Sequence, residues 1–351
     1  MSIQRVSKGS LRPRTRQREI AARAGVSIST VSRVLNDAGY VSADAQRRVL
    51  SAATDLGYAG VSRGTIDGLK RVGVFVPASI ARATSAGFLH ADIVAGVEAE
   101  CRKDGLHLGF TALPPGTAGI DIVQNEIQQH AVEGILLLSI NEHELVERIL
   151  GFGVPAVLIN AMHPTLPIDT FLPDSEGGVL HAMEYLIALG HRHIVHATHV
   201  THRPRVPGRH EMYRFALEAA GIPYDPALVI ETPLDDEHGA YMAMANALLR
   251  GLPHFTAVFC FNDRVAVGVL RALQETGRRI PDDVSIVGFD DTTIAAFLSP
   301  PLTTIRVERE LLGALAVRRL RERSSAPDLI PIRVALATRL IERQSAGSAR
   351  H

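Results

Sequence analysis

The chain has 351 residues, of which 46% are hydrophobic and 21% are charged, and its 37 Lys and Arg balance its 37 Asp and Glu. This length allows two or three compact domains, and the composition is that of a soluble globular protein. No run of apolar residues is long enough to cross a membrane. The basic, polar start lacks the apolar centre of a secretory signal, which predicts a cytoplasmic protein. Two cysteines, Cys101 and Cys260, are too few for a disulfide framework and indicate buried thiols.

The zero net charge conceals an asymmetry along the chain. Residues 1–71 contain 13 Lys and Arg against 5 Asp and Glu, a balance of +8, whereas residues 72–351 contain 24 against 32, a balance of −8. A basic first part favours attraction to nucleic-acid phosphates, because neutralising the backbone releases counterions. Residues 1–15 are expected to form a basic flexible arm.

Residues 16–58 predict a small helical DNA-binding domain. Apolar and small residues from Ile20 to Val34 have the rhythm of two short helices that are broken at Gly25, which is the pattern of a helix-turn-helix. Ser27 suits the N-cap of the second helix. A third helix is expected to begin near Ser42 and end at Gly57, and its apolar residues close the core, namely Val49, Leu50, Ala53 and Leu56.

The outer face of the second helix is expected to enter the DNA major groove. The segments AGVSISTVSRVLN and GYVSADAQRRVLSAATDLGY resemble the headpiece of the LacI/GalR family of bacterial transcription regulators. The residues expected to contact DNA are Ser27, Ile28, Ser29, Thr30, Ser32, Arg33, Asn36 and Tyr40. Ile28, Ser29, Arg33 and Asn36 are expected at base edges or nearby phosphates, and Ser27, Thr30 and Ser32 mainly at phosphates.

Residues 59–71 predict a hinge that departs from the family pattern. In the family this segment starts with Pro-Asn and forms a short helix whose Leu wedges into the minor groove. Here Gly60 and Val61 take those places and further glycines interrupt any helix. Ile66 or Leu69 is the substitute wedge that the sequence offers. We therefore expect more of the sequence specificity to come from the major groove.

From Val72 onward strands and helices alternate, which predicts a core of two doubly wound parallel-sheet lobes, like a periplasmic binding protein. Segments such as FNDRVAVGVLRALQETG and PPLTTI extend the family resemblance to about residues 16–345. The family connects its lobes by three crossings. The resemblance thus implies an N-terminal lobe of residues 72–171 plus 302–328, a C-terminal lobe of residues 172–301 plus 329–345, and a tail of residues 346–351.

The resemblance also implies an effector site between the lobes. The family pattern places Arg209, Asn262 and Asp290 there. A guanidinium together with carboxylate and amide groups suits a polyhydroxylated ligand, because hydroxyls both donate and accept hydrogen bonds. Asn160 stands where an Asp is common, and Arg309 stands near a place that often holds an aromatic group. A long loop through residue 90 is expected to bring Arg82, Ser85 and His90 to the mouth of the site. The extra positive charge favours an acidic sugar derivative.

No motif for nucleotide binding, hydrolysis or zinc catalysis is present. The adjacent carboxylates Asp290 and Asp291 are expected to point in different directions at a strand end, which disfavours general acid–base catalysis by the pair. The histidines between residues 191 and 202 are numerous enough to suggest a metal site. Alternation along a strand would place His191 and His193 on one face and His196 on the other, so no metal is expected. No cofactor is expected either.

The sequence therefore predicts a homodimeric, sequence-specific repressor that binds a palindromic operator and responds to a small carbohydrate-like effector. The absence of a heptad-bearing tail disfavours a tetramer. A purine or other non-sugar corepressor remains an alternative effector. The rivals from other classes are a sugar-binding protein without regulatory DNA binding and an enzyme that works between the lobes.

Overall fold

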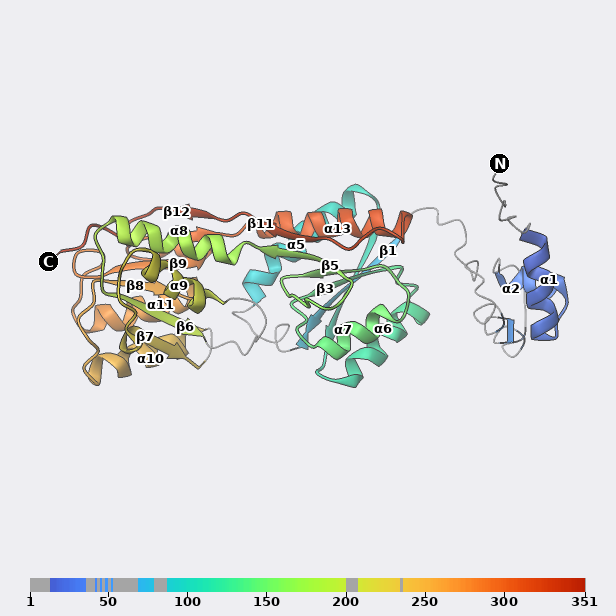
Figure 1. Ribbon diagram of the computed structural model, residues 1–351, viewed down its shortest axis with the longest axis horizontal. Helices are drawn as coiled ribbons and strands as arrows, with labels where there is room; N and C mark the ends of the chain where they lie inside the picture. Colours follow the sequence, from blue (N-terminus) through green and yellow to red (C-terminus); the bar gives the residue numbers. More distant parts are fainter. Residues whose placement is uncertain are drawn as a thin grey trace, which may run out of the picture. The chain divides into compact units, whose positions relative to one another are not determined.

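The structure is a computed structural model of the chain (Figure 1) and describes residues 13–35, 42, 45, 48–49, 52, 69–78, 87–199, 208–233 and 236–350. The chain divides into two compact units, residues 1–68 and 69–351. We call them the headpiece and the core. Several predictions concern residues outside the described ones: the DNA contacts of Asn36 and Tyr40, the Ile66 wedge, most of the hinge, and Arg82, Ser85 and His202.

The headpiece contains the predicted pair of short helices, α1 (Pro13–Ala24) and α2 (Ile28–Leu35). Gly25 joins them with a φ of 64°, a left-handed conformation that favours glycine. The Ser27 hydroxyl accepts a hydrogen bond from the backbone N–H of Thr30 over 3.0 Å, which confirms Ser27 as the N-cap of α2. Helix α1 begins at Pro13 and so includes the last three residues of the predicted arm.

A small apolar core holds the headpiece together. Ile20, Val31 and Val49 are fully buried and form one cluster with Ala21, Ala24, Val34 and Ala52. The spacing of these residues on α1 and α2 is helical, so each helix turns one apolar stripe inward. The participation of Val49 agrees with the predicted third helix, and the backbone N–H of Ala45 reaches the Ser42 hydroxyl at 3.4 Å, as its N-cap would require.

The described part of the core contains two parallel-stranded sheets (Figure 1). The first has the order β11-β5-β4-β3-β1-β2 and the second has the order β12-β10-β9-β8-β6-β7, in which only β12 is antiparallel. The strands of the first sheet are β1 (Arg71–Pro77), β2 (His107–Leu113), β3 (Gly134–Leu138), β4 (Ala156–Ile159), β5 (Asp169–Pro173) and β11 (Arg333–Leu336). Those of the second are β6 (Ile194–His199), β7 (Val229–Thr232), β8 (Ala257–Cys260), β9 (Ser285–Asp290), β10 (Thr303–Arg306) and β12 (Arg339–Ile341).

Helices accompany both sheets, as continuous apolar strands require burial on both faces. The first lobe contains α5 (Gly87–Lys103), α6 (Thr117–Gln129), α7 (His143–Leu150) and α13 (Arg309–Ser325). The second lobe contains α8 (Ser175–Ala188), α9 (Arg209–Ala219), a 3-10 turn η1 (Pro226–Leu228), α10 (Glu237–Leu249), α11 (Asp263–Glu275) and α12 (Thr293–Phe297). This architecture confirms the predicted fold class.

The lobe boundaries differ from the prediction at each crossing. Strand β5 keeps residues up to Pro173 in the first sheet. Residues 303–306 were assigned to the first lobe, but β10 pairs with β9 in the second sheet. Residues 333–336 were assigned to the second lobe, but β11 pairs with β5 in the first sheet. Strand pairing therefore moves the crossings to 173–175, 306–309 and 336–339.

Three predicted irregular segments are ordered parts of the core. Leu69 is 6% exposed and packs in the apolar core, so it is not the free minor-groove wedge that the sequence suggested. The long loop predicted through residue 90 ends earlier, because α5 begins at Gly87 and includes His90. In the predicted tail, the backbone carbonyl of Gly347 accepts a hydrogen bond from Ser285, and the N–H of Ala349 donates to Leu189.

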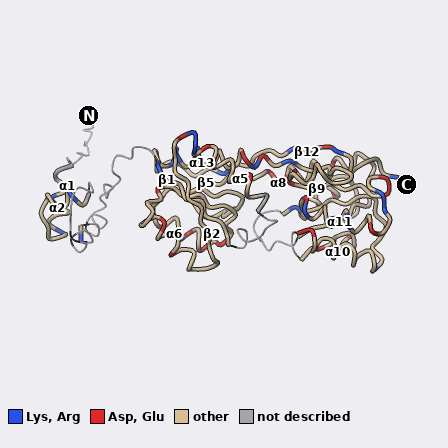
Figure 2. Tube along the Cα trace, turned by 180° about the vertical axis from the view of Figure 1, so that it is seen from behind, with Lys and Arg blue, Asp and Glu red and all other residues tan. Residues whose placement is uncertain are grey.

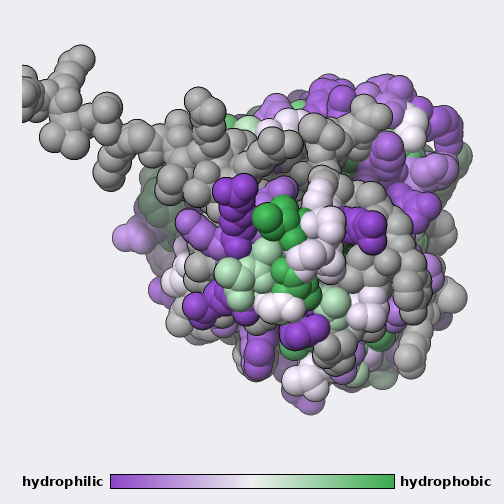
Figure 3. Space-filling view, turned by 90° about the vertical axis from the view of Figure 1, so that its right-hand side faces the viewer, coloured by the Kyte–Doolittle hydropathy of each residue, from purple (hydrophilic) through white to green (hydrophobic). Residues whose placement is uncertain are grey.

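Figure 2 shows basic and acidic residues side by side along α13, where Arg318 pairs with Glu100 and Arg321 with Asp104. Among the coloured side chains in Figure 3, hydrophobic ones gather near the centre of the view and are bordered by hydrophilic ones. None of the helices in the described ranges is both long and apolar enough to cross a membrane.

Candidate functional site

Helix α2 presents the predicted DNA-reading side chains. Ser27, Ile28, Ser29 and Arg33 are exposed, while Thr30 and Ser32 are half-buried. The hydroxyl of Ser27 lies 2.7 Å from that of Ser29 and 2.8 Å from that of Thr30. Ile28 is 44% exposed although it is apolar, which suits contact with a thymine methyl group. Arg33 makes no hydrogen bond or ion pair with any described residue, so its guanidinium is available to a base or a phosphate.

The first lobe places a chain of hydrogen-bonded polar groups near the carboxyl ends of β3 and β4. The Asn160 side-chain amide donates to the Ser139 hydroxyl over 3.0 Å, and His90 Nε2 lies 2.8 Å from the same hydroxyl. Asn160 and Ser139 both have a left-handed φ, 55° and 57°, which is uncommon for residues other than glycine. Ser139 was missed by sequence reasoning, although a polar residue directly after the buried strand LLL was a usable signal.

The second lobe brings together two of the predicted charged residues. Arg209 is the first residue of α9, and its guanidinium lies 3.7 Å from the Asp290 carboxylate. The guanidinium also donates to the Phe261 carbonyl and lies over the rings of Phe261 and Phe289, at 4.5 and 3.8 Å from their centroids. These contacts fix the orientation of the Arg209 side chain.

Asn262 stands directly before α11 and uses one side-chain atom to cap it. Its side-chain oxygen accepts a hydrogen bond from the backbone N–H of Val265 over 2.8 Å and caps the helix. Its side-chain nitrogen has no partner among the described residues, which leaves donors for a ligand. The residue is 7% exposed.

Arg309 connects the two lobes. Its guanidinium donates to Asp92 of α5 over 2.8 Å and to the backbone carbonyl of Asp290 at the end of β9. Arg306 in turn pairs with Asp291, which also accepts a hydrogen bond from Arg343 over 2.6 Å. The positive charges of Arg306 and Arg309 are therefore paired with carboxylates, and Asp92 and Asp291 are partners that the sequence did not reveal.

Described histidines of the run lie close to polar groups of the second lobe. His191 precedes the strand and lies within hydrogen-bond distance of the Thr256 hydroxyl and the Gly347 carbonyl, at 2.9 and 3.0 Å. His196 is fully buried beside the Phe259 carbonyl, and burial lowers its pKa to about 3. The described residues contain no group of three or more His, Cys, Asp or Glu arranged to hold a metal ion.

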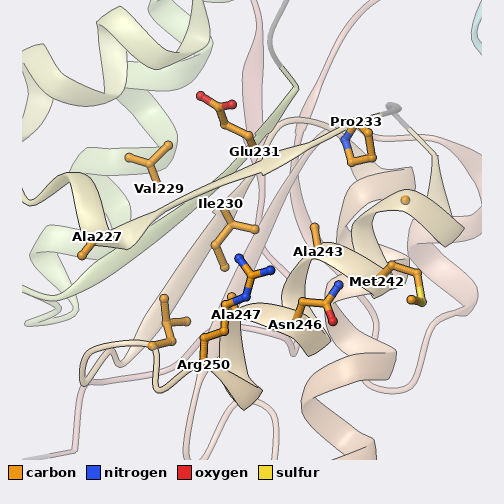
Figure 4. Close-up of a pocket in the computed structure, with 12 residues that line it drawn as sticks. Ala227, Val229, Ile230, Glu231, Pro233, Met242, Ala243, Asn246, Ala247 and Arg250 are labelled. Atoms are coloured by element: carbon orange, nitrogen blue, oxygen red, sulfur yellow. The ribbon is translucent and has the colours of Figure 1, made fainter.

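A surface hollow of about 370 Å³ lies elsewhere, between the edge strand β7 and α10 (Figure 4). Ile230, Ala243 and Ala247 line it together with Asn246 and Arg250. None of the predicted effector residues borders this hollow. The candidate effector site is therefore defined by its converging polar side chains.

A helix-turn-helix headpiece joined to a two-lobed α/β core defines a DNA-binding transcriptional regulator. Comparison with known proteins agrees: residues 18–60 match the family described as bacterial regulatory proteins, lacI family, and residues 183–346 match a periplasmic binding protein-like domain. The ribose operon repressor of Haemophilus influenzae is 32% identical over 314 residues, which cover 89% of this chain and 92% of the relative. The chain belongs to the lacI family.

Further similarities span nearly the whole chain. A repressor named PurR from Vibrio parahaemolyticus is 30% identical over 319 residues, covering 87% of this chain and 91% of the relative. The solved complex of the transcriptional regulator CelR with cellobiose is 30% identical, with a TM-score of 0.69, and covers 94% of this chain and 99% of its own. The lac repressor dimer bound to operator and the anti-inducer ONPF is 26% identical, with a TM-score of 0.68 and coverages of 94% and 98%.

Proposed function

We propose that the chain is a cytoplasmic homodimeric repressor that binds a palindromic operator through α2 and changes its operator affinity when a carbohydrate-like effector binds between the core lobes. The observation that carries this proposal is the convergence of Arg209 and Asp290 in the core of a chain whose headpiece exposes a DNA-reading helix. The proposal includes no catalytic step, cofactor or metal. If NMR showed that the protein converts a bound ligand into another compound, the proposal would be contradicted.

The headpiece half of the proposal is tested on α2. Arg33 is exposed, and its guanidinium is suited to paired hydrogen bonds with guanine or to a phosphate contact. We expect Arg33→Ala to weaken binding to the chain's own promoter region about tenfold or more. Fluorescence anisotropy with labelled DNA measures this change.

The matched control for Arg33→Ala is Arg192→Ala, because Arg192 is an exposed arginine of the core. It removes the same charge outside the headpiece and is expected to leave operator binding unchanged. Equal operator affinities for wild type and Arg33→Ala would show that α2 is not the reading helix.

The effector is proposed to be a neutral polyhydroxylated molecule. Arg209 and Asp290 supply donors and acceptors at one end, and Ser139 and Asn160 supply neutral polar groups from the other lobe. The acidic sugar that the sequence favoured is less well supported, because Arg309 pairs with Asp92 and Arg306 pairs with Asp291. A hydroxyl-rich ligand satisfies this mixed set better than an anion does.

A purine corepressor is the second candidate, since one similar repressor is named PurR while others are named for ribose or bind cellobiose. Calorimetric titration of the full chain with D-ribose, cellobiose, D-glucuronate and hypoxanthine separates the classes. Binding of a neutral sugar supports the proposal, and binding of only hypoxanthine or only glucuronate contradicts it.

Homodimer formation is proposed because a palindromic operator needs two headpieces related by a two-fold axis, and a similar lac repressor is a dimer on its operator. Helix α12 offers an apolar contact: Ile294 and Phe297, three residues apart on one face, are 43% and 81% exposed. We expect Phe297→Glu to shift the chain towards monomer in analytical ultracentrifugation.

Leu249→Glu is the matched control for this test, because Leu249 is 85% exposed on α10 and is not part of the α12 face. It is expected to leave the oligomeric state unchanged. A Phe297→Glu variant that sediments like the wild type would exclude α12 from the dimer contact.

A further inference from the structure

The most deeply buried acid near the candidate effector site is Asp263, the first residue of α11, whose side chain is fully buried. One carboxyl oxygen, Oδ2, accepts hydrogen bonds from the backbone N–H and the hydroxyl of Thr292 over 2.6 and 2.9 Å. The other, Oδ1, accepts one from the Thr304 hydroxyl over 2.5 Å. No arginine, lysine or histidine of the described residues forms an ion pair with it. A buried carboxyl without a cationic partner is costly, so its presence calls for a specific role.

These hydrogen bonds join two segments that each carry a candidate effector residue. Asn262 immediately precedes Asp263, and Thr292 follows the Asp290–Asp291 turn. Asp290 and Asp291 have φ values of 105° and 51°, which are uncommon for residues other than glycine. Two successive residues in this conformation persist only where their surroundings hold them. The Asp263 carboxyl is one such restraint, since it binds the residue directly after the turn.

The neighbouring backbone leaves space for this carboxyl. A Cβ atom at Gly288 of β9 would lie 2.5 Å from Asp263 Oδ1 and 2.8 Å from Leu302. Gly288 pairs with Thr304 on β10, so the carboxyl sits above this pair and reaches the Thr304 hydroxyl. A side chain at position 288 would therefore collide with the Asp263 carboxyl, so glycine leaves the space that this acid occupies.

We propose that Asp263 is a positioning residue of the effector site, which holds the Asp290–Asp291 turn so that the Asp290 carboxylate faces Arg209. This inference rests on the proposed effector function of Arg209 and Asp290. Asp263 itself is fully buried, so its carboxyl is not accessible to a ligand. The groups that face it are Thr292, Thr304 and the nearby carboxylate of Asp290. Asp263 therefore affects ligand binding indirectly, by holding the Asp290–Asp291 turn in place.

The test uses the full chain and compares Asp263→Ala with Asp263→Asn. Alanine removes every acceptor, whereas asparagine keeps an oxygen for Thr292 and offers its side-chain N–H to the Thr304 hydroxyl, which accepts as well as donates. Hydrogen exchange measured by mass spectrometry is read in peptides covering residues 290–295. We expect exchange there about tenfold faster in Asp263→Ala and nearly normal in Asp263→Asn.

Two further variants separate positioning from general stability. Asp169→Ala removes the other fully buried carboxylate, which pairs with Arg319 in the first lobe, and should lower the unfolding temperature without changing exchange at 290–295. Thr292→Val keeps the size of the side chain and removes only its hydroxyl. If Asp263→Ala does not fold, Thr292→Val carries the test, and it is expected to give a smaller increase in exchange at the same peptides.

Ligand affinity completes the test, with D-ribose, cellobiose and hypoxanthine as probes in calorimetry. A probe that binds the wild type should bind Asp263→Ala about tenfold or more weakly and recover in Asp263→Asn. Unchanged exchange at 290–295 in Asp263→Ala, or unchanged affinity for a probe that binds the wild type, would overturn the positioning role. Faster exchange in Asp263→Ala that is reversed in Asp263→Asn supports the positioning role, even if no probe binds the wild type. Failure of every probe to bind the wild type would instead contradict the proposed effector class.

Discussion

The two lobes of the core share a parallel-sheet order but hold buried charge differently. In the first lobe, Asp169 is fully buried at the start of β5 and is paired with Arg319 and Arg323. In the second lobe, Asp263 is fully buried at the start of α11 and has only amide and hydroxyl donors. The first carboxylate ties α13 to its sheet, whereas the second restrains the turn that carries Asp290. These two carboxyl groups are therefore equally buried but have different structural roles.

The same contrast holds for the groups offered to a ligand. The first lobe contributes His90, Ser139 and Asn160, which are joined by hydrogen bonds, whereas the second contributes the Arg209–Asp290 pair. Charge-assisted hydrogen bonds are roughly twice as strong as neutral ones. We therefore expect the second lobe to supply most of the effector affinity and the first lobe to refine which ligand is accepted.

The largest expected effect concerns the stability of the second lobe against pH. Burial, followed by the nearby charge of Asp290, raises the pKa of Asp263 from 3.8 to about 7. Between these values the folded chain binds more protons than the unfolded chain, so this group's contribution to the free energy of unfolding decreases as the pH rises. The total change is on the order of 4 kcal/mol.

Asp263→Asn imitates the protonated side chain and does not titrate. Denaturant unfolding from pH 4 to pH 8 should thus show the variant gaining stability relative to the wild type as the pH rises. A constant difference between the two proteins over this range would mean that Asp263 does not titrate there.

The next effect concerns the charged pair. Arg209→Ala removes a charge-assisted donor and leaves Asp290 without this partner, so effector affinity should fall about 100-fold. Calorimetry with the sugar that binds the wild type measures the loss. Arg214→Ala, on the exposed side of the same helix, is the control and should bind normally.

The smallest expected effect concerns the first lobe. Asn160→Ala removes a neutral hydrogen-bonding group next to Ser139 and should weaken effector binding only about fivefold. The same calorimetric titration serves here. A loss as large as that of Arg209→Ala would reverse the ranking of the two lobes.

The fold was largely predictable from the sequence, because its signals are local. Gly25 ends one helix, Ser27 caps the next, and the apolar strands carry their own pattern. The lobe crossings were misplaced, since the segments that contain β10 and β11 do not show which sheet they join; that depends on pairing with β9 and β5.

The candidate site was only partly predictable. The family pattern pointed to Arg209 and Asp290, and the structure places them together. The roles of Ser139, Asp92 and Asp263 were not predicted from the sequence. These roles depend on contacts with residues distant in sequence, such as Arg309 and Thr304. Such pairings also changed the inferred ligand, since Arg309 counts as positive in the sequence but is neutralised in the fold.

Ligand binding at Arg209 and Asp290 is proposed to change operator affinity at α2. The most direct measurement is an operator titration, with and without the bound sugar, on wild type and Arg209→Ala. We predict that the sugar shifts operator affinity of the wild type, whereas Arg209→Ala binds the operator normally without sugar and shows no shift at the same sugar concentration. An equal shift in both proteins would contradict this coupling between Arg209 and α2.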